Sequence, residues 1–196
     1  MPPPDTALAL HFASPACAAA CVTLFPEDRH LAVTREDLRP RAPFAGKLFE
    51  VLAGHARGTV VGLVVPVARP AGSPPPSGAR LPGALLAVAD HVNLELRGPL
   101  TGPWPAGVPR DFPQVAGIYQ PALVRASGGP RVYSSGVVVA GVADARRLTP
   151  FEAQAVAELG VIAVSDVLVP AAIVAAYHGL TLAACGVPPA DDNDEQ

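Results

Sequence analysis

Residues 149–187, TPFEAQAVAELGVIAVSDVLVPAAIVAAYHGLTLAACGV, alternate between helix and strand signals and set the fold class of the chain. Thr149 is placed as a helix N-cap, with proline at the next position, Glu152 three residues after the cap and Gly160 at the end. The following segments predict a short strand, a second helix and a last strand, over 161–170, 170–180 and 181–187. Because strands and helices alternate, we expect an α/β fold with a largely parallel sheet and helices on its faces.

The residues before this stretch add strands and one further helix. We predict strands over 6–13, 84–92 and 132–142, an alanine-rich helix over 16–25, and two strands around a turn at 53–58 within 46–67. Prolines and glycines exclude regular structure from 68–83 and 99–113. We therefore expect a disordered amino terminus over 1–5, one domain over 6–187, and an acidic, disordered tail over 188–196 that is either solvated or bound to a partner.

Composition excludes several classes of function. A chain of 196 residues is long enough for one domain with a sizeable core. The charged fraction of 16% and the net charge of -3 disfavour binding to nucleic acid or to an anionic membrane. No apolar run reaches the roughly 18–20 residues of a membrane span, so we expect a soluble, intracellular protein.

The cysteines Cys17, Cys21 and Cys185 are odd in number. A zinc site needs about four ligands in suitable spacing, and no matching histidine or cysteine pair is visible. We expect reduced, buried cysteines and no metal site, with a redox or metal role as the alternative.

Polar residues follow the apolar run ALLAVA directly, in DHVNLELRGPLTGP, residues 90–103. Strand ends that carry such side chains build the sites of many α/β proteins. Asp90, His91 and Asn93 are therefore either ligand contacts or polar residues that hydrogen-bond loop backbone and so hold the fold. His178, near a predicted helix end, is expected to carry a favourable charge or to pack, rather than to act as a base.

A charged segment with Asp144, Arg146 and Arg147 is the second candidate. It is either a solvated loop or an arginine pair that contacts an anionic partner. Trp104, in the proline-rich loop, joins Arg146 and Arg147 as a candidate for protein interaction.

Five blocks of sequence, in order, resemble the trimeric purine nucleoside phosphorylases. DHVNL at 90–94 is similar to that family's DHINL, and the other blocks are PLTGP at 99–103, FPQVAGIY at 112–119, GVVVAGV at 136–142, and the run 149–180. The resemblance implies a single-domain, three-layer phosphorylase-like fold with a mixed, largely parallel central sheet flanked by helices. The fold is reduced relative to the family, because the family's central strand and NAAGG turn fall where this chain has only the 68–83 loop.

The resemblance also implies that most of the family's chemistry is lost. Its phosphate loop GSGLG corresponds to residues 13–17, where Ser14 remains but Pro15 removes an amide. Its GMS motif becomes Ser165-Asp166-Val167. Its other ligands fall at Phe44, Arg69, Arg146, Arg147 and Leu148, or have no counterpart.

These losses predict a catalytically inactive phosphorylase-fold protein, without catalytic residues or cofactors, reused as a protein-interaction or regulatory module. The alternative is a divergent nucleoside phosphorylase or hydrolase, or a nucleoside-binding protein. Its ligand-binding candidates are Ser14, Asp90, His91, Asn93 and Asp166. The partner stays open, and includes a second copy of the chain, a nucleoside or phosphate. The GC-rich residue usage and small size also resemble a herpesvirus accessory protein of the alphaherpesvirus small nuclear phosphoprotein family, which implies the host nucleus.

Overall fold

The computed structural model describes residues 8–38, 47–70, 84–95, 98–101, 106, 112–124, 132–144 and 147–189. The strands are β1 (Leu8–Phe12), β2 (Arg29–Val33), β3 (Val60–Pro66), β4 (Leu85–Asn93), β5 (Val132–Gly141), β6 (Ala163–Ser165) and β7 (Thr181–Val187). The helices are α1 (Pro15–Leu24), α2 (Arg35–Leu38), α3 (Lys47–Ala53), the 3-10 helix η1 (Pro121–Leu123), α4 (Pro150–Glu158) and α5 (Leu168–Tyr177). None of these helices is both long and apolar enough to cross a bilayer.

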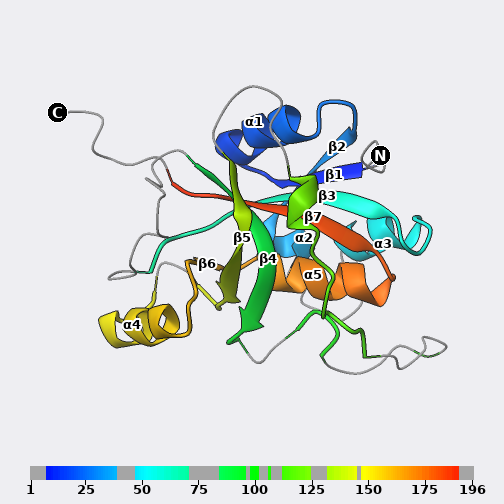
Figure 1. Cartoon of the computed structure of the whole chain (residues 1–196). Coiled ribbons are helices and arrows are strands. Elements are labelled where there is room, and N and C mark those ends of the chain that lie inside the picture. The colour runs from blue at the N-terminus through cyan, green and yellow to red at the C-terminus, as the bar shows by residue number, and fades with distance from the viewer. Residues whose placement is uncertain are drawn as a thin grey trace.

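A single mixed sheet forms the centre of the molecule (Figure 1). Its seven strands have the order β2-β1-β3-β7-β4-β5-β6. Among the described strands, five neighbouring pairs are parallel, and the β4–β7 pair alone is antiparallel. The prediction of a mixed, largely parallel sheet is therefore confirmed.

The sheet curls until its edge strand β6 meets the residues that follow β3. Ala68 and Val164 form an antiparallel bridge in which each backbone N–H donates to the other residue's carbonyl, with both N···O distances 2.8 Å. Strands that lie at opposite positions of the sheet order are thus brought together. As a result, the carboxyl ends of β3 and β6 lie side by side.

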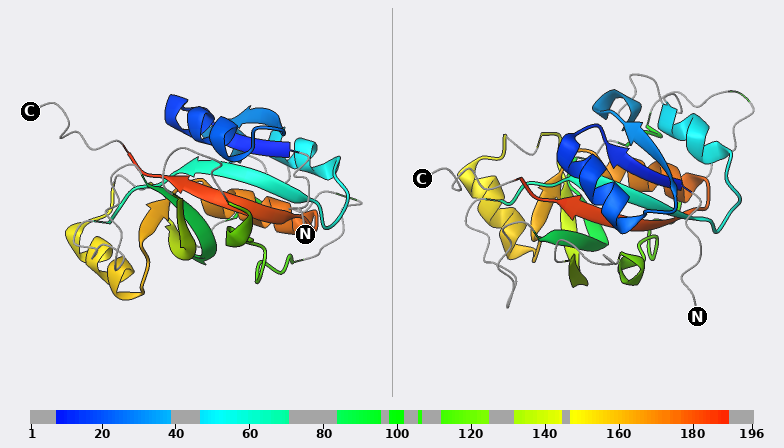
Figure 2. Two further views of the ribbon diagram at one scale, coloured as in Figure 1. Left: turned by 45° about the horizontal axis from the view of Figure 1, so that its top comes forward. Right: turned by 90° about the horizontal axis from the view of Figure 1, so that it is seen from above.

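Helices cover both faces of the sheet, which gives the expected three layers (Figure 2). Helix α1 packs on one face, over a cluster that includes Leu24, Val64 and the three cysteines. Helices α3 and α5 pack on the other face, over the largest apolar cluster, which includes Leu63 and Leu182. A smaller cluster lies between α4 and the ends of β5 and β6.

The local signals of the helix α4 are confirmed in detail. The Thr149 hydroxyl accepts the Glu152 backbone N–H at 3.3 Å, and the Glu152 carboxylate accepts the Thr149 backbone N–H at 2.8 Å. This reciprocal pair satisfies two amides that a helix start leaves without partners. Gly160 then adopts φ +76°, a left-handed conformation that suits a glycine after a helix end.

One predicted strand is wrong, and another is longer than the strand that the structure contains. Residues 47–53 form the helix α3, because Leu48 and Leu52 lie one helical turn apart and both pack into the core, each 1% exposed. The strand predicted over 161–170 ends at Ser165, and α5 begins at Leu168. The first turn of α5 begins at this point because the Ser165 hydroxyl accepts the backbone N–H groups of Val167 and Leu168, both at 3.3 Å.

The sequence-based expectations missed β2 and α2, which follow α1. The loop predictions are tested only in part, because 71–83 and most of 102–111 lie outside the described residues. So do residues 1–5 and 190–196, and therefore the predicted amino-terminal and carboxyl-terminal disorder. The described residues of the 99–113 segment contain no helix or strand.

We expect all three thiols to be unreactive in the folded protein. Cys17, Cys21 and Cys185 are free and at most 1% exposed, and burial raises the pKa of Cys21 and of Cys185 to about 12. Because the thiolate is the reactive form, a disulfide reagent at pH 8 should modify no cysteine in buffer and three in denaturant. Rapid modification of the folded protein would instead favour the redox role.

Candidate functional site at the carboxyl ends of the strands

The carboxyl ends of β4, β5 and β6 lie at one level of the sheet. Asn93 is paired with Gly141, and Gly141 with Ser165. The usual strand spacing places Asn93 and Ser165 about 10 Å apart. The Ser165 hydroxyl also donates to the Pro66 carbonyl at 3.0 Å, which joins the end of β3 to the same edge. This edge therefore collects residues from four separate parts of the chain.

Asp166 is the buried charge of this edge, with 4% of its surface exposed. Its carboxylate forms an ion pair with the guanidinium of Arg35, which begins α2 directly after β2. The Arg35 side chain is 51% exposed, so the pair has one buried and one solvated member. A phosphate placed beside Asp166 would meet a like charge, which opposes its binding.

Ser14 starts α1 as its N-cap. Its hydroxyl accepts the backbone N–H of Cys17 at 3.3 Å. Pro15 has no N–H to offer, as the sequence predicted. The hydroxyl of Ser14 is thus engaged by the helix, and the turn offers fewer amides than a glycine-rich phosphate loop.

His91 packs against Tyr119, a contact that the sequence-based interpretation missed although both residues lie in the matched blocks. The Nδ1 atom of His91 is 2.8 Å from the Tyr119 hydroxyl, and the two rings meet edge to face with centroids 5.5 Å apart. Burial lowers the pKa of His91, and the nearby Asp90 partly opposes that shift. Burial also raises the pKa of the Tyr119 phenol, which stays a neutral hydrogen-bond partner.

Asp90 and Asn93 form local hydrogen bonds to backbone. The Asp90 carboxylate accepts the His91 N–H at 2.8 Å, and the Asn93 amide oxygen accepts the Glu95 N–H at 3.1 Å. Val92, between them, packs with the cluster beneath α4. Since side chains alternate along a strand, His91 and Asn93 point to the opposite face. A ligand role for these residues stays a prediction.

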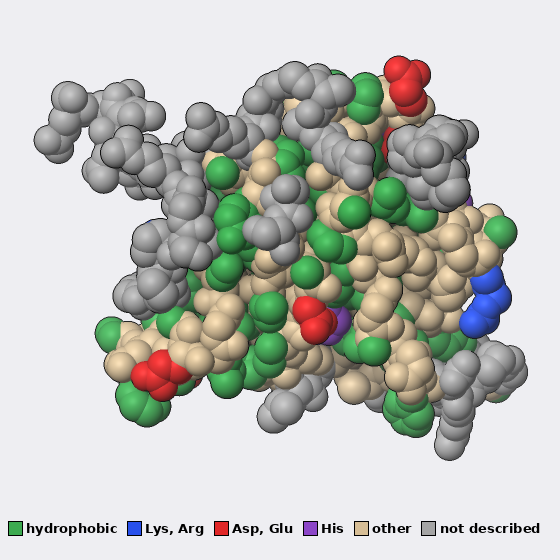
Figure 3. Space-filling view, viewed as in Figure 1, with side chains coloured by type: hydrophobic (Ala, Val, Ile, Leu, Met, Phe, Trp, Pro, Cys, Tyr) green, Lys and Arg blue, Asp and Glu red, His purple; other side chains and the backbone are tan. Residues whose placement is uncertain are grey.

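A cavity of about 770 Å³ lies beyond the ends of β4 and β5 and beside α4. Its apolar lining is Leu94, Val142, Ala143, Leu148, Ala155, Val156 and Leu159, and its charged lining is Glu95, Asp144, Arg147 and Glu152. Figure 3 shows acidic and hydrophobic side chains gathered over the α4 region of the surface. The cavity thus combines apolar walls with hydrogen-bonding groups of both charges.

Arg147 is the one predicted interaction residue that the described part of the chain contains. It lines this cavity, and its Nε lies 3.6 Å from the Asp144 carboxylate. Arg146, Trp104 and Phe44 lie outside the described residues. Sequence reasoning missed Glu95 and Glu152 as lining residues, and only the position of Glu95 directly after the DHVNL block could have indicated it. Within the described ranges, no group of three histidine, cysteine or carboxylate side chains is placed to hold a metal ion.

His178 lies at the end of α5 and is packed, which is one of its two predicted roles. Its ring meets those of Phe49 and Tyr177 with centroid distances of 4.6 and 5.3 Å. Its Nε2 atom is buried without a hydrogen-bond partner. Burial lowers the pKa of His178, while the Phe49 backbone opposes that shift.

The stability of the protein is expected to fall in mild acid. His91 and His178 have a lower pKa in the folded state than in the unfolded chain. The unfolded chain therefore binds more protons than the folded one below about pH 6.5. The contribution of the two histidines to the free energy of unfolding is fully present above that pH, and it is lost as the pH falls toward their folded-state pKa values. Urea unfolding at pH 7.5 and 5.5 should show this loss, and it should be smaller in His91→Gln and His178→Gln. An unchanged loss in the double variant would contradict the assignment.

Comparisons with known proteins bear on the fold. No family model matches the chain, and no curated protein does. Solved structures do match. The fold is similar to that of purine nucleoside phosphorylases. The Schistosoma mansoni enzyme with a novel monocyclic inhibitor has a TM-score of 0.50 and 18% identity, over 69% of this chain and 53% of that one.

Two further complexes of the Schistosoma phosphorylase agree. The complex with acetate has a TM-score of 0.50 and 18% identity, over 66% of this chain and 48% of that one. The complex with hypoxanthine has a TM-score of 0.50 and 16% identity, over 65% of this chain and 47% of that one. The chain spans about half the length of these structures. The predicted phosphorylase-like fold is confirmed, and at this identity the likeness concerns the fold alone.

Proposed function

We propose that this protein binds a nucleoside or its base in the cavity beyond β4 and β5, and that it does not use phosphate to cleave the glycosidic bond. The observation that carries the proposal is the cavity itself, which opens at the strand ends of a phosphorylase-like fold. Its volume of about 770 Å³ lies within the usual range for small-ligand sites, about 300–1,000 Å³.

The lining of the cavity suits a nitrogen heterocycle. Leu94, Val142 and Leu148 offer apolar contacts to a flat ring. The carboxylates of Glu95 and Glu152 can accept hydrogen bonds from ring N–H and amino groups. The resemblance also aligns Arg147 and Leu148 with the base pocket of the phosphorylases, and one similar phosphorylase was crystallised with hypoxanthine.

The other residues at the carboxyl ends of the strands favour ligand binding without phosphorolysis. Asp166 puts a buried carboxylate where the resemblance places part of a phosphate site. Ser14 caps α1, and Pro15 removes an amide from the same turn. A phosphate at this edge would therefore be repelled by the Asp166 carboxylate, and the nearby Arg35 guanidinium is already paired with that carboxylate.

A thermal-shift titration with purine and pyrimidine nucleosides and bases, with and without phosphate, tests the proposal. A ligand at 100 times its dissociation constant stabilises the fold by about 2.7 kcal/mol, which raises Tm by roughly 5–11 °C for a chain of this length. Ala155→Trp, which fills the cavity from the exposed side of α4, should abolish the shift. Gln154→Trp, on the same helix but outside the cavity lining, should retain it.

The outcomes separate binding from catalysis. No shift with any nucleoside or base, or equal shifts in Ala155→Trp and Gln154→Trp, would contradict binding in this cavity. Release of free base that depends on phosphate would contradict the absence of phosphorolysis. A chromatographic assay for free base measures the second point directly.

A protein-interaction module is the second candidate, favoured by exposed apolar side chains on α4 and directly after it. Phe151 is 80% exposed and Leu159 62% exposed. If this surface binds a second copy of the chain, light scattering should show an oligomer that Phe151→Ser with Leu159→Ser dissociates. A monomer at high concentration would contradict self-association. The herpesvirus origin, the nuclear location and the loss of catalysis stay predictions.

A further inference from the structure

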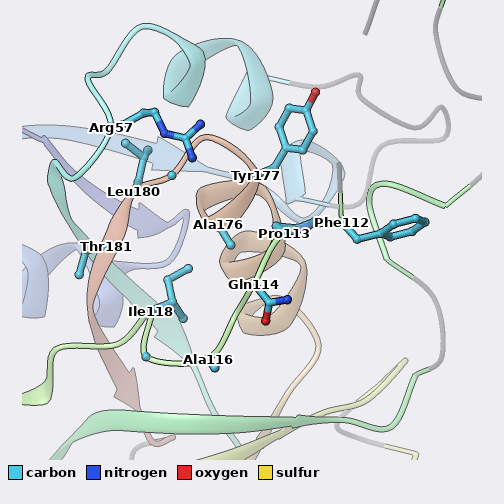
Figure 4. A pocket seen from close by; sticks show the side chains of 12 residues that line it. Arg57, Phe112, Pro113, Gln114, Ala116, Ile118, Ala176, Tyr177, Leu180 and Thr181 are labelled. Atoms are coloured by element: carbon cyan, nitrogen blue, oxygen red, sulfur yellow. The ribbon is translucent and has the colours of Figure 1, made fainter. Parts of the chain in front are cut away.

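We infer that a second cavity, at the opposite end of β3 and β7, binds a small organic anion with an apolar body. The cavity has a volume of about 340 Å³. It lies between Arg57, the last turn of α5, and the segment 112–118 (Figure 4). Because Thr181 lines it and β7 runs from there to Val187 beside Pro66, strand geometry places it about 20 Å from the candidate site.

Backbone hydrogen bonds hold the walls of this cavity in place. Gly58 donates to the Gly179 carbonyl at 2.7 Å, and Thr181 donates to the Thr59 carbonyl at 3.0 Å. Leu182 donates to the Ile118 carbonyl at 2.8 Å, which ties the segment 112–118 to β7. Since the walls are already ordered, a ligand would lose little binding energy to ordering them.

The guanidinium of Arg57 rests on backbone at a position that only glycine permits. Gly179 adopts φ +70°, and a Cβ there would lie 2.9 Å from Arg57 Nε and 3.0 Å from Cζ. The missing side chain thus leaves room for the guanidinium to lie against the Gly179 backbone, where Arg57 lines the cavity. No carboxylate in the described part of the chain forms an ion pair with Arg57.

The charge and polarity of the lining define the ligand. Arg57 is the one charged side chain among the described residues that line the cavity, so the site favours an anion and disfavours a cation. A guanidinium binds carboxylate or phosphate through two parallel hydrogen bonds. Ile118 and Leu180 form an apolar wall, each 4% exposed, and Gln114 and Thr181 add hydrogen-bonding side chains. The ligand chemistry is therefore one carboxylate or phosphate group on a compact apolar body.

Isothermal titration with four probes tests this inference: benzoate, phenyl phosphate, inorganic phosphate and benzyl alcohol. The two probes that combine an anion with a ring should bind at least about tenfold more tightly than benzyl alcohol or inorganic phosphate, because only they use both the guanidinium and the apolar wall. Equal binding of benzyl alcohol, or no binding of either aromatic anion, would overturn the inference. If inorganic phosphate bound as tightly as the two aromatic anions, the apolar wall would contribute nothing to binding, and the inferred apolar body of the ligand would be wrong.

Substitutions of Arg57, with control variants elsewhere in the chain, test whether the probes bind in this cavity. Arg57→Gln should weaken benzoate and phenyl phosphate by about tenfold or more, and Arg57→Lys should weaken them less, because lysine keeps the charge but not the planar fork. Arg29→Gln, an exposed arginine on β2, is the matched control and should bind as the parent does. Ala155→Trp should also leave this binding unchanged, which separates it from the proposed nucleoside site. Unweakened binding in Arg57→Gln, with an unchanged Tm, would contradict the assignment.

Discussion

Gly136→Ala is expected to lower the free energy of unfolding by about 2–5 kcal/mol, because it adds backbone strain of about 1–2 kcal/mol and overpacking of about 1–3 kcal/mol. Gly136 adopts φ +81° within β5, a conformation that a Cβ disfavours. A Cβ there would also lie 2.6 Å from the Cβ of Ala89 on the neighbouring strand β4. The Ala89 Cβ is fixed to its backbone, so relief requires the two strands to separate.

Gly117→Ala is the matched control for this prediction. Gly117 also has positive φ, +73°, but a Cβ there would meet no atom within 4 Å. Its cost should be confined to backbone strain, about 1–2 kcal/mol. Urea unfolding of both variants measures the difference. Equal losses in the two variants would show that the close approach of β4 and β5 does not limit stability.

Arg35→Met is expected to lower the free energy of unfolding by about 2–4 kcal/mol, because it leaves Asp166 buried without its partner. The ion pair has one member at 6% and one at 51% side-chain exposure, so the loss should be smaller than for a pair buried on both sides. The double variant Arg35→Met with Asp166→Leu should recover most of the loss, since it removes the buried charge as well.

An exposed pair provides the control for Arg35→Met. Arg147 pairs with Asp144 at 3.6 Å, and its side chain is 86% exposed. Arg147→Met should therefore cost less than about 1 kcal/mol. A double-mutant cycle by urea unfolding separates the pair from the other contacts of each residue. A loss below about 1 kcal/mol for Arg35→Met would mean that water, rather than Arg35, solvates Asp166.

Several elements could be predicted from the sequence because their causes are local. The helix α4 carries its own capping residues, so neighbouring side chains alone indicate where it begins. Helix α1 is similar, with Ser14 before Pro15. The apolar runs of β3, β5 and β7 predicted buried strands, because such runs are stable only between covered faces.

Other features depend on segments that are distant in the sequence, and no local pattern predicts them. Residues 47–53 form a helix because Leu48 and Leu52 pack against α5, which lies more than a hundred residues further along the chain. The partner of Asp166 is Arg35, from the opposite part of the sequence. His91 meets Tyr119 only because both flank β7 in the folded sheet.

The division between the two sets is physical. Capping, turn formation and strand preference arise from interactions between residues a few positions apart, so the order of the amino acids already specifies α4, α5 and the apolar strands. The cavities, the meeting of β3 with β6 through Ala68 and Val164, and the burial of Asp166 arise when chain folding brings distant surfaces into contact. Those contacts depend on side-chain packing and on the curl of the sheet, which exist only in the folded chain.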